Sequence, residues 1–288
     1  MLVRMPMSSL ADFIDRNRRL FVLTGAGCST DSGIPDYRDA NGDWKRSPPV
    51  SIQAFSSSAA VRQRYWARSF VGWQRLRQAQ PNRAHRALVG LEQQGRLELL
   101  VTQNVDGLHQ AAGSRQVIDL HGRLDRVRCM DCAGWMSREA WQTELLRRNS
   151  AWRAVQAEVA PDGDADLQEP ASSQFAVPAC ARCGGVLKPD VVFFGESVPR
   201  DRVAAAMRGL ERADAVLVIG SSLMLYSGYR FVHAAAQSGK PIAAVNIGRT
   251  RADELLTLKI SAPCAHALAA GLMPRRELAP QSDPHTGS

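Results

Sequence analysis

The chain has 288 residues, of which 45% are hydrophobic, so it can bury a full core as one large domain with a small insertion. No run of about 18 apolar residues occurs, and a membrane-spanning helix is therefore not expected. The formal net charge of +8 comes from 36 basic and 28 acidic residues, and the arginines are scattered over every segment. Scattered charge indicates compositional bias, whereas a nucleic-acid site needs a clustered basic stripe, so no specific nucleic-acid partner is expected.

The N-terminal segment predicts a cytoplasmic protein. It lacks the apolar core of a signal peptide, and Asp12 and Asp15 argue against a transit peptide, which is usually poor in acidic residues. Ser8 or Ser9 can cap a short helix that ends near Asn17 and leads into the first strand.

A glycine turn follows this first strand. Residues 21–23 are apolar and bounded by turn residues, as expected of a central parallel strand. Gly25 and Gly27 let backbone N–H groups approach a ligand that a Cβ atom would keep away, and pyrophosphate is suited to such a turn. A Gly-x-Gly pair is also common in ordinary strand-to-helix turns. The polar continuation at residues 35–38 favours a ligand-binding loop.

The turn differs from the fingerprint of ordinary dehydrogenases. That pattern requires a third glycine where this chain has Thr30, and an acidic residue at the end of a second strand about 20 positions further on. Asp43 lies near that distance, but no strand pattern surrounds it. A hydride-transfer enzyme is therefore disfavoured.

The run from Gly25 to Arg38 resembles the signature of the sirtuins, the NAD-dependent protein deacylases. The resemblance implies the α/β class, with a parallel-sheet Rossmann-like NAD-binding domain over residues 8–122 and 186–273 and an inserted zinc-binding module over residues 123–185. Residues 277–288 are expected to form a disordered tail. The first cofactor contacts that the resemblance implies are Gly25, Ala26, Gly27, Ser29, Pro35, Asp36, Tyr37 and Arg38.

The next predicted helix, over residues 56–78, carries a tyrosine and an arginine three positions apart. Tyr65 and Arg68 share a helix face, so they could grip a carboxylate through a phenol hydrogen bond and a forked guanidinium. Their spacing resembles the Tyr-x-x-Arg pair that desuccinylating sirtuins use on acidic acyl groups. A packed tyrosine beside a solvated arginine explains the spacing equally well, so both interpretations stay open.

Polar residues follow two further predicted strands, 97–101 and 117–120, the first preceded by a helix over residues 83–94. Ligands bind beyond the carboxyl ends of parallel strands, which makes these residues candidates for ligand contact. A histidine at this position can accept a proton from a ribose hydroxyl. The resemblance implies that His121 is the general base, with Gln103, Asn104 and Asp106 around the nicotinamide and its ribose, and that Asn104 and Asp106 also take part in catalysis. His109 is expected to pack beneath the site on a helix.

Two Cys-x-x-Cys pairs predict one structural zinc ion, bound by Cys129, Cys132, Cys180 and Cys183. Disulfides are disfavoured in a reducing compartment. The 47 residues between the pairs exceed the spacing of an ordinary zinc ribbon and indicate an insertion, with a helix over residues 137–148 and a surface loop over residues 161–174. A four-thiolate site has no open position for water, so the zinc is expected to stabilise the module.

The C-terminal part continues the α/β pattern, with predicted helices over residues 202–210 and 226–238 and strands over 215–219 and 241–245. Further NAD contacts implied by the resemblance are Gly220, Ser221, Ser222, Asn246, Ile247, Gly248 and Cys264. The apolar segment before these elements resembles the sirtuin strand that pairs with the acyl-lysine peptide, which implies substrate contacts at Val192, Phe193, Phe194, Gly195 and Glu196. A plain buried strand is the alternative for this segment.

Together these motifs identify the chain as a member of the sirtuin family, closest to the class II branch of the mitochondrial lipoamidase and ADP-ribosyltransferase. The implied reaction removes acyl groups from protein lysines with NAD as co-substrate, and the implied state is a monomer. An ADP-ribosyltransferase would use the same NAD pocket on another acceptor. A zinc-ribbon nucleic-acid binder would explain the cysteines and the charge, but not the glycine turn or His121.

Cys28, inside the glycine turn, has two interpretations. A position at the start of a short helix lowers the pKa of a thiol and would suit an oxidation switch. A small buried residue that fills space beneath the cofactor is the simpler hypothesis and is favoured, because free cysteines are often inert core residues.

Overall fold

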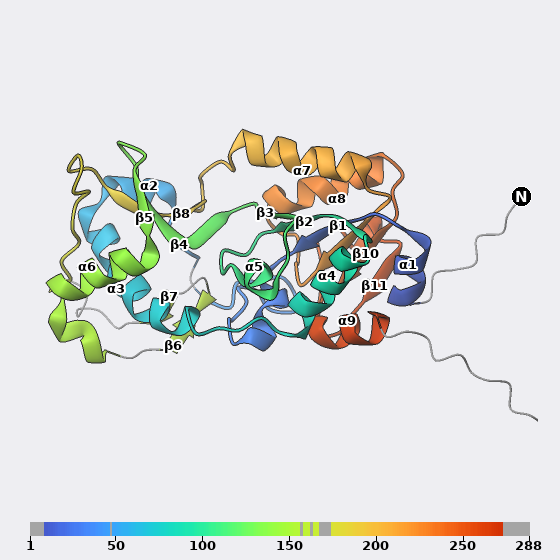
Figure 1. The fold of residues 1–288 in the computed structure, drawn as a ribbon, viewed down its shortest axis with the longest axis horizontal. Helices are drawn as coiled ribbons and strands as arrows, with labels where there is room; N and C mark the ends of the chain where they lie inside the picture. Colours follow the sequence, from blue (N-terminus) through green and yellow to red (C-terminus); the bar gives the residue numbers. More distant parts are fainter. Residues whose placement is uncertain (1–8, 47, 156–157, 162–163, 167–173, 273–288) are drawn as a thin grey trace, which may run out of the picture.

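The computed structural model describes residues 9–46, 48–155, 158–161, 164–166 and 174–272. Its larger part is a sheet of six parallel strands in the order β11-β10-β9-β1-β2-β3, which confirms the predicted Rossmann-like α/β class (Figure 1). The strands are β1 (Leu20–Thr24), β2 (Leu97–Thr102), β3 (Val117–Asp119), β9 (Ala215–Ile219), β10 (Ile242–Val245) and β11 (Leu258–Ile260). Within the described residues, we find no helix with the length and apolarity that a membrane crossing needs.

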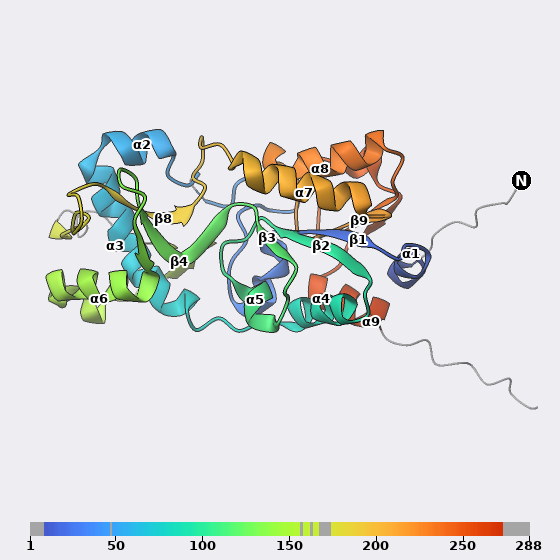
Figure 2. The same cartoon turned by 45° about the horizontal axis from the view of Figure 1, so that its top comes forward.

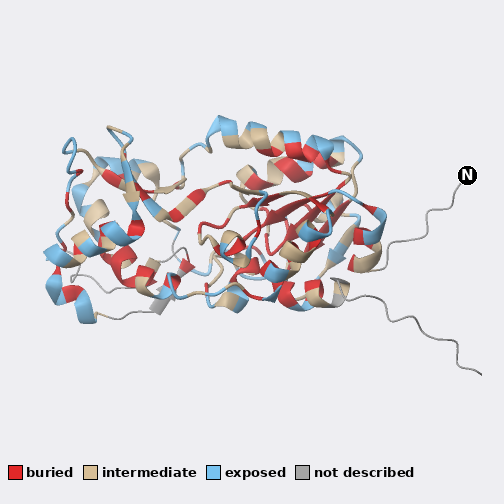
Figure 3. Cartoon of the chain, in the orientation of Figure 1, coloured by how far each residue is buried: buried red, intermediate tan, exposed pale blue. Residues whose placement is uncertain are grey.

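Successive side chains of the central strands pack on opposite faces of the sheet. Leu20 and Val22 of β1 belong to one buried cluster, and Phe21 and Leu23 belong to the other. Helices cover both faces (Figure 2): α1 (Leu10–Arg16), α4 (Arg83–Gln93) and α9 (Cys264–Leu272) on the first, α7 (Arg200–Arg212) and α8 (Tyr226–Gln237) on the second. Every residue of β1 is therefore buried, which explains its nearly continuous apolar sequence (Figure 3).

β1 lies in the middle of the sheet, between β9 and β2. The chain proceeds outward from β1 through β2 to β3, and it later returns to the other side of β1 as β9, β10 and β11. The strand order thus reverses beside β1, and ligands of open α/β sheets bind at the carboxyl ends of the strands at such a point. The short helix α5 (Leu108–Ala112) follows β2 at this end of the sheet.

A smaller part lies beside the sheet and has its own antiparallel sheet in the order β5-β4-β8 (Figure 1). Its elements are α2 (Ile52–Ser57), α3 (Ala59–Leu76), β4 (Gly122–Cys129), β5 (Trp135–Ser137), α6 (Arg138–Arg148) and β8 (Leu187–Val191). Trp66 of α3 and Trp141 of α6 are both buried, with ring centroids 5.2 Å apart. These two rings form the centre of the small part's core.

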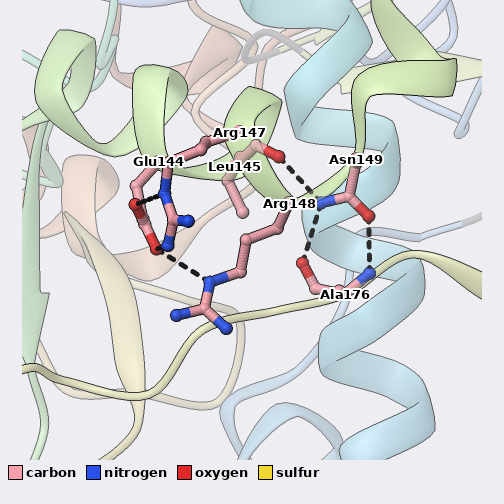
Figure 4. A network of polar contacts seen from close by, with 6 residues as sticks. All are labelled: Glu144, Leu145, Arg147, Arg148, Asn149 and Ala176. Carbon is pink, nitrogen blue, oxygen red and sulfur yellow. Dashed lines mark hydrogen bonds and ion pairs between the residues drawn. The ribbon is translucent and has the colours of Figure 1, made fainter.

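The segment between the cysteine pairs is tied to the small part at the end of α6. Asn149 Nδ2 donates to the carbonyl oxygens of Leu145 (2.8 Å) and Ala176 (2.9 Å), and Ala176 N donates to Asn149 Oδ1 (2.7 Å) (Figure 4). Asn149 is buried, so these bonds also satisfy its polar atoms.

The predicted helix over residues 56–78 is in fact two helices, α2 and α3. Ser58 between them has an extended backbone (φ −125°, ψ 119°), and its side chain accepts a hydrogen bond from Val61 N as the N-cap of α3. Hydrophobic periodicity does not reveal such a cap. The other predicted helices and strands are present, with ends within two residues of the predicted ones, except that β8 ends at Val191, so residues 192–196 of the expected peptide-pairing strand lie beyond it.

The predicted surface loop over residues 161–174 is wrong at its start. β7 (Asp164–Asp166) pairs with β6 (Glu158–Ala160) as a two-stranded antiparallel sheet, and Ala165 is fully buried in the core of the small part. Three-residue strands leave no recognisable alternation, so only packing against α3 reveals them. Residues 162–163 and 167–173 of this segment lie outside the described part.

The predicted domain boundaries, residues 8–122 with 186–273 and residues 123–185, stay a prediction. α3 and β8 fall in the larger domain by these boundaries, whereas their buried side chains share a cluster with α6. The predicted tail, residues 277–288, lies outside the described residues.

Candidate active site

The loops after β1 and β9 touch each other at the point where the strand order reverses. Gly27 N donates to the carbonyl oxygen of Gly220 (2.9 Å). A Cβ atom at Gly25 would lie 2.8 Å from that oxygen, and one at Gly220 would lie 2.2 Å from Cys28 N, at a backbone φ of +62°. The glycines are therefore required for contact between the two loops, in addition to any approach of a ligand.

Three predicted site residues meet between the ends of β1 and β2. Asn104 Nδ2 donates to Ser29 Oγ (3.0 Å), and Ser29 Oγ donates to Asp106 Oδ2 (2.7 Å). The other carboxylate oxygen of Asp106 accepts from Leu108 N (2.9 Å) at the start of α5. Ser29 and Asn104 are buried, so the network holds their polar groups in one arrangement.

Gln103 connects the ends of three strands. Its Nε2 donates to Ser221 Oγ after β9 (2.7 Å) and to the carbonyl oxygen of Thr24 in β1 (3.3 Å). Its own backbone oxygen lies 2.9 Å from His121 Nδ1. The four segments that the sequence assigned to one site thus converge on this side chain and its carbonyl.

His121 is held in one tautomer by its neighbours. A carbonyl oxygen can only accept, so Nδ1 carries the proton that points at Gln103. Burial lowers the pKa of His121 to about 4, with the charges of Arg202 and Arg230 acting in the same direction and the bond to Gln103 opposing them. The ring is therefore neutral at pH 7, and Nε2 has a free electron pair that accepts from Ser227 Oγ at 2.9 Å. Such a nitrogen can take a proton from a hydroxyl group.

Ser227 was not predicted from the sequence. It lies in the first turn of α8, and no local pattern distinguishes its hydroxyl from any other. Only the tertiary structure brings it to His121, which lies 106 positions earlier in the chain.

The other predicted cofactor residues make contacts of their own in the loops after β1 and β9 and at α9. Arg38 stacks on Trp44 with its guanidinium carbon 3.9 Å from the ring centroid, and it donates to the carbonyl oxygen of Gly42 (2.7 Å). Asp36 forms an ion pair with Lys45. Pro35 and Tyr37 lie half-buried in the same loop, Ala26 begins the 3-10 helix η1 (Ala26–Cys28), the carbonyl oxygen of Ser222 accepts from Arg251 N (2.9 Å), and Cys264 is buried at the start of α9.

The loop after β10 closes this group. Asn246 Nδ2 donates to the carbonyl oxygen of Ile247 (3.0 Å), and the Ile247 side chain is 58% exposed. A Cβ atom at Gly248 would lie 2.3 Å from the carbonyl oxygen of Ala40, to which Arg249 N donates at 2.7 Å. The loop that carries Asp36 to Arg38 is thus bound to the loop after β10.

These strand ends fit a dinucleotide such as NAD. Amide, hydroxyl and carboxylate groups from β1, β2 and β9 are suited to ribose hydroxyls and a carboxamide. The exposed aliphatic side chain of Ile247 offers an apolar surface to a planar ring. In the glycine turn itself, the N–H groups of Gly25 and Gly27 donate to the carbonyl oxygens of Ile219 and Gly220, so the expected approach of these two N–H groups to a pyrophosphate is not seen.

A cavity of about 410 Å³ lies between this site and the small part. Its lining includes the predicted substrate residues Tyr65, Arg68, Val192, Phe193 and Phe194, together with Asp36 and Tyr37 of the cofactor set. Gly195 and Glu196 are not part of the lining. Glu196 instead pairs with Lys188 Nζ (2.8 Å) and accepts from Phe193 N (2.9 Å), which holds the turn after the apolar segment.

Part of the backbone of this segment is already paired. Val192 N donates to the carbonyl oxygen of His121 (2.7 Å), and the carbonyl oxygen of Phe194 accepts from Ile52 N (2.8 Å). A peptide that adds to this segment would therefore use the groups that these two bonds leave.

The four predicted metal ligands form one cluster. Cys129 Sγ lies 3.5 Å from Cys183 Sγ, and Cys132 Sγ lies 3.9 Å from Cys180 Sγ. Sulfurs at about 2.3 Å from a tetrahedral zinc ion are about 3.8 Å apart, whereas a disulfide needs about 2.05 Å. The cluster therefore fits one structural zinc ion.

A second group of metal-binding residue types lies under the glycine turn, formed by Cys28, His85 and His109. His85 Nδ1 accepts from Asn82 N (3.2 Å) as part of a capping box, so its proton is on Nε2, and Nε2 cannot bind a metal in that form. His109 Nε2 lies 2.9 Å from Thr24 Oγ1, and burial lowers the pKa of His109 to about 3. The two imidazoles are thus neutral packing residues, as predicted for His109.

Cys129→Ser and Cys183→Ser should each lose the zinc ion and lower the melting temperature by roughly 5–10 °C, because part of the metal's binding energy is folding energy. Zinc content and thermal unfolding of the purified variants test this. Cys28→Ala is the matched control and should retain one zinc per chain. A zinc-free variant with the parent's melting temperature would contradict a structural role.

Cys28 should be unreactive in the folded protein. Its side chain is 1% exposed, and burial raises the pKa of its thiol well above the usual value, with Cys264 and Asp106 adding to the effect. Iodoacetamide should label Cys28 only after unfolding, and Cys28→Ala should cost about 1 kcal/mol of stability or less. Rapid labelling of the native protein, read by peptide mass spectrometry, would restore the redox interpretation.

Three comparisons agree with this geometry. A model of the Sir2 family matches residues 25–227. A relative from Bordetella bronchiseptica named NAD-dependent protein deacetylase is 63% identical, over 91% of this chain and 96% of its own length. A protein from Bos taurus named NAD-dependent protein lipoamidase sirtuin-4, mitochondrial, is 48% identical, over 91% of this chain and 84% of its own length.

A solved structure described as Sir2-p53 peptide-NAD+ has the same fold, with a TM-score of 0.72 and 32% sequence identity. The match covers 92% of this chain and 97% of that chain. The family model and the relatives together account for most of the chain, from the glycine turn through the cysteine pairs to the last strands. The chain belongs to the Sir2 family, the sirtuins.

Proposed function

We propose that this sirtuin removes acyl groups from protein lysines with NAD as co-substrate, and releases nicotinamide and O-acyl-ADP-ribose. The observation that carries the proposal is the position of His121, a neutral imidazole whose unprotonated Nε2 now accepts from Ser227 Oγ, at the strand ends where the fold binds NAD. Relatives named NAD-dependent protein deacetylase support the same reaction.

When bound, NAD supplies an electrophilic ribose carbon and nicotinamide as the leaving group. The chain's own contribution is positioning and proton transfer. Asn104, Asp106 and Ser29 form a fixed polar network that can hold the ribose and the carboxamide. His121 Nε2 accepts the proton of a ribose hydroxyl, while the Gln103 carbonyl holds the proton on Nδ1 in place.

The acyl group is expected to enter the cavity beside this site. Apolar side chains of Val192, Phe193 and Phe194 line one wall, and the backbone beside them can pair with an extended peptide. A solved sirtuin with a peptide and NAD in its description supports this placement.

The alternative, protein ADP-ribosyl transfer, uses the same NAD site on another acceptor. Incubation of the protein with NAD and an acetyl-lysine peptide separates the two by mass spectrometry. We expect the peptide to lose the acetyl group and O-acetyl-ADP-ribose to form. ADP-ribose added to protein, with the peptide unchanged, would favour the alternative. A cytoplasmic location and a monomeric state remain predictions from the sequence.

His121→Tyr should abolish deacylation, because the phenol is not a proton acceptor at neutral pH, while NAD binding persists through the loops after β1, β2 and β9. Calorimetric titration of NAD and single-turnover deacylation measure the two effects separately. Loss of NAD binding together with loss of thermal stability would show that His121 acts structurally.

Ser227→Ala should move the acid limb of the kcat/KM profile to higher pH by up to about one unit. The Ser227 hydroxyl donates to the electron pair of neutral His121, so its removal disfavours the neutral form and raises a pKa that now lies near 4. Activity needs the unprotonated ring, so it is then lost at a higher pH as the solution is acidified. Ser227→Thr keeps a hydroxyl and is the control; an unchanged limb in Ser227→Ala would refute the contact's role.

A further inference from the structure

An acidic residue of the segment between the cysteine pairs reaches the acyl cavity. Asp164 and Arg68 both line the cavity, and they form a two-point ion pair: Arg68 Nε donates to Asp164 Oδ1 (2.9 Å), and Arg68 Nη2 lies 2.7 Å from Oδ2. This parallel arrangement is the strongest geometry available to a guanidinium and a carboxylate. The ion pair occupies the two guanidinium N–H groups, on Nε and Nη2 of Arg68, that an acidic acyl group would require.

The position of Asp164 is fixed by its neighbours. Ala160 pairs with Asp164 across the β6–β7 ladder, and Ala165 is fully buried in the core around Trp66. Ala165 N also donates to Asp164 Oδ1 (2.9 Å). The carboxylate is thus placed by the fold of the insertion, and does not depend on a chance contact of two long side chains.

Asp164 also acts on the other member of the Tyr-x-x-Arg pair. Burial, and after it the charge of Asp164, raises the pKa of Tyr65. The ring of Tyr65 packs against Phe55 and Phe193, with centroids 5.3 and 5.2 Å apart. Tyr65 therefore stays neutral, and its ring packs among aromatic rings beside the cavity.

Equal numbers of described positive and negative side chains line the cavity. They are two arginines, Arg46 and Arg68, and two aspartates, Asp36 and Asp164, of which Asp36 also pairs with Lys45 outside the lining. Without Asp164 the lining would carry a net positive charge, and it would attract a carboxylate. With Asp164 present, the Arg68–Asp164 pair carries no net charge. The apolar wall at residues 191–194 is still available to contact an acyl chain.

We infer that Asp164 is an internal counter-ion of Arg68, which makes uncharged acyl groups the preferred substrate class and disfavours acyl groups that end in a carboxylate. This inference rests on the proposed deacylase function and names the acyl class of that same site. An acidic acyl chain must either displace Asp164 from Arg68 or share one guanidinium with it, and two carboxylates at one arginine repel each other. An uncharged chain needs no such exchange and contacts the apolar wall.

How strongly the protein discriminates against acidic acyl groups depends on the exposure of the Arg68–Asp164 pair. The side chains of Arg68 and Asp164 are 38% and 36% exposed, so water screens their interaction and a moderate discrimination is expected. The discriminating measurement is the ratio of kcat/KM for a succinyl-lysine peptide to that for the butyryl-lysine peptide of the same sequence, with saturating NAD. Both acyl groups have four carbons, and only the first ends in a carboxylate.

The wild-type protein should prefer the butyryl peptide. Asp164→Asn removes the charge but keeps an oxygen that can accept from Ala165 N and Arg68, so the fold should persist. This variant should raise the succinyl-to-butyryl ratio about fivefold. The gain should disappear in the double variant Asp164→Asn/Arg68→Gln, because the freed guanidinium is its source.

Glu144→Gln is the matched control. It also removes a carboxylate from arginines of the insertion, Arg147 and Arg148, at a place that is not part of the cavity lining (Figure 4). Its ratio should equal that of the wild type. A similar change in this control would show a general charge effect and overturn the inference.

Two other results would also overturn it: a wild-type preference for succinyl, or an unchanged ratio in Asp164→Asn. Failure of the underlying function is distinguishable from these. In that case the wild-type protein would remove the acyl group from neither peptide, whereas failure of the inference alone leaves deacylation intact and the ratio unchanged by Asp164→Asn.

Discussion

The contact between the loops after β1 and β9 is the constraint on which the site depends. It exists because Gly27 and Gly220 have no side chains, so one backbone can donate directly to the other. Once the loops are in contact, Gln103, which directly follows β2, donates to Ser221, and its carbonyl oxygen orients His121. The strand ends thus form one connected network in which each polar group fixes the next.

His121 lies where the chain leaves the large sheet for the small part. β4 begins at Gly122, where φ is +83° and a Cβ atom would lie 2.1 Å from the carbonyl oxygen of Asp190. Val192 N donates to the carbonyl oxygen of His121, so the wall of the acyl cavity starts from the same point. The cysteine cluster lies at the other ends of β4 and β8, and a zinc ion there acts on the site through the position of these strands.

The charge state of the site is set by burial and by the backbone. A carboxylate beside His121 Nδ1 would raise its pKa, whereas the Gln103 carbonyl orients the ring without adding a full charge. Burial then keeps the imidazole neutral at physiological pH. In the acyl cavity the balance is reached differently, because Arg68 is paired with the carboxylate of Asp164. The imidazole of His121 and the Arg68–Asp164 pair therefore carry no net charge, each for a different reason.

The sequence by itself determined the α/β class, the candidate zinc ligands and the candidate base. Each depends on a local pattern: apolar runs that end in polar turns, two Cys-x-x-Cys pairs, and a histidine directly after a strand. Only the tertiary structure decided the partners of the key side chains, because they come from elements that form separately and meet through packing. Arg68 and Asp164 are 96 positions apart, and His121 and Ser227 are 106 apart, a separation at which no periodicity or spacing carries information about contact.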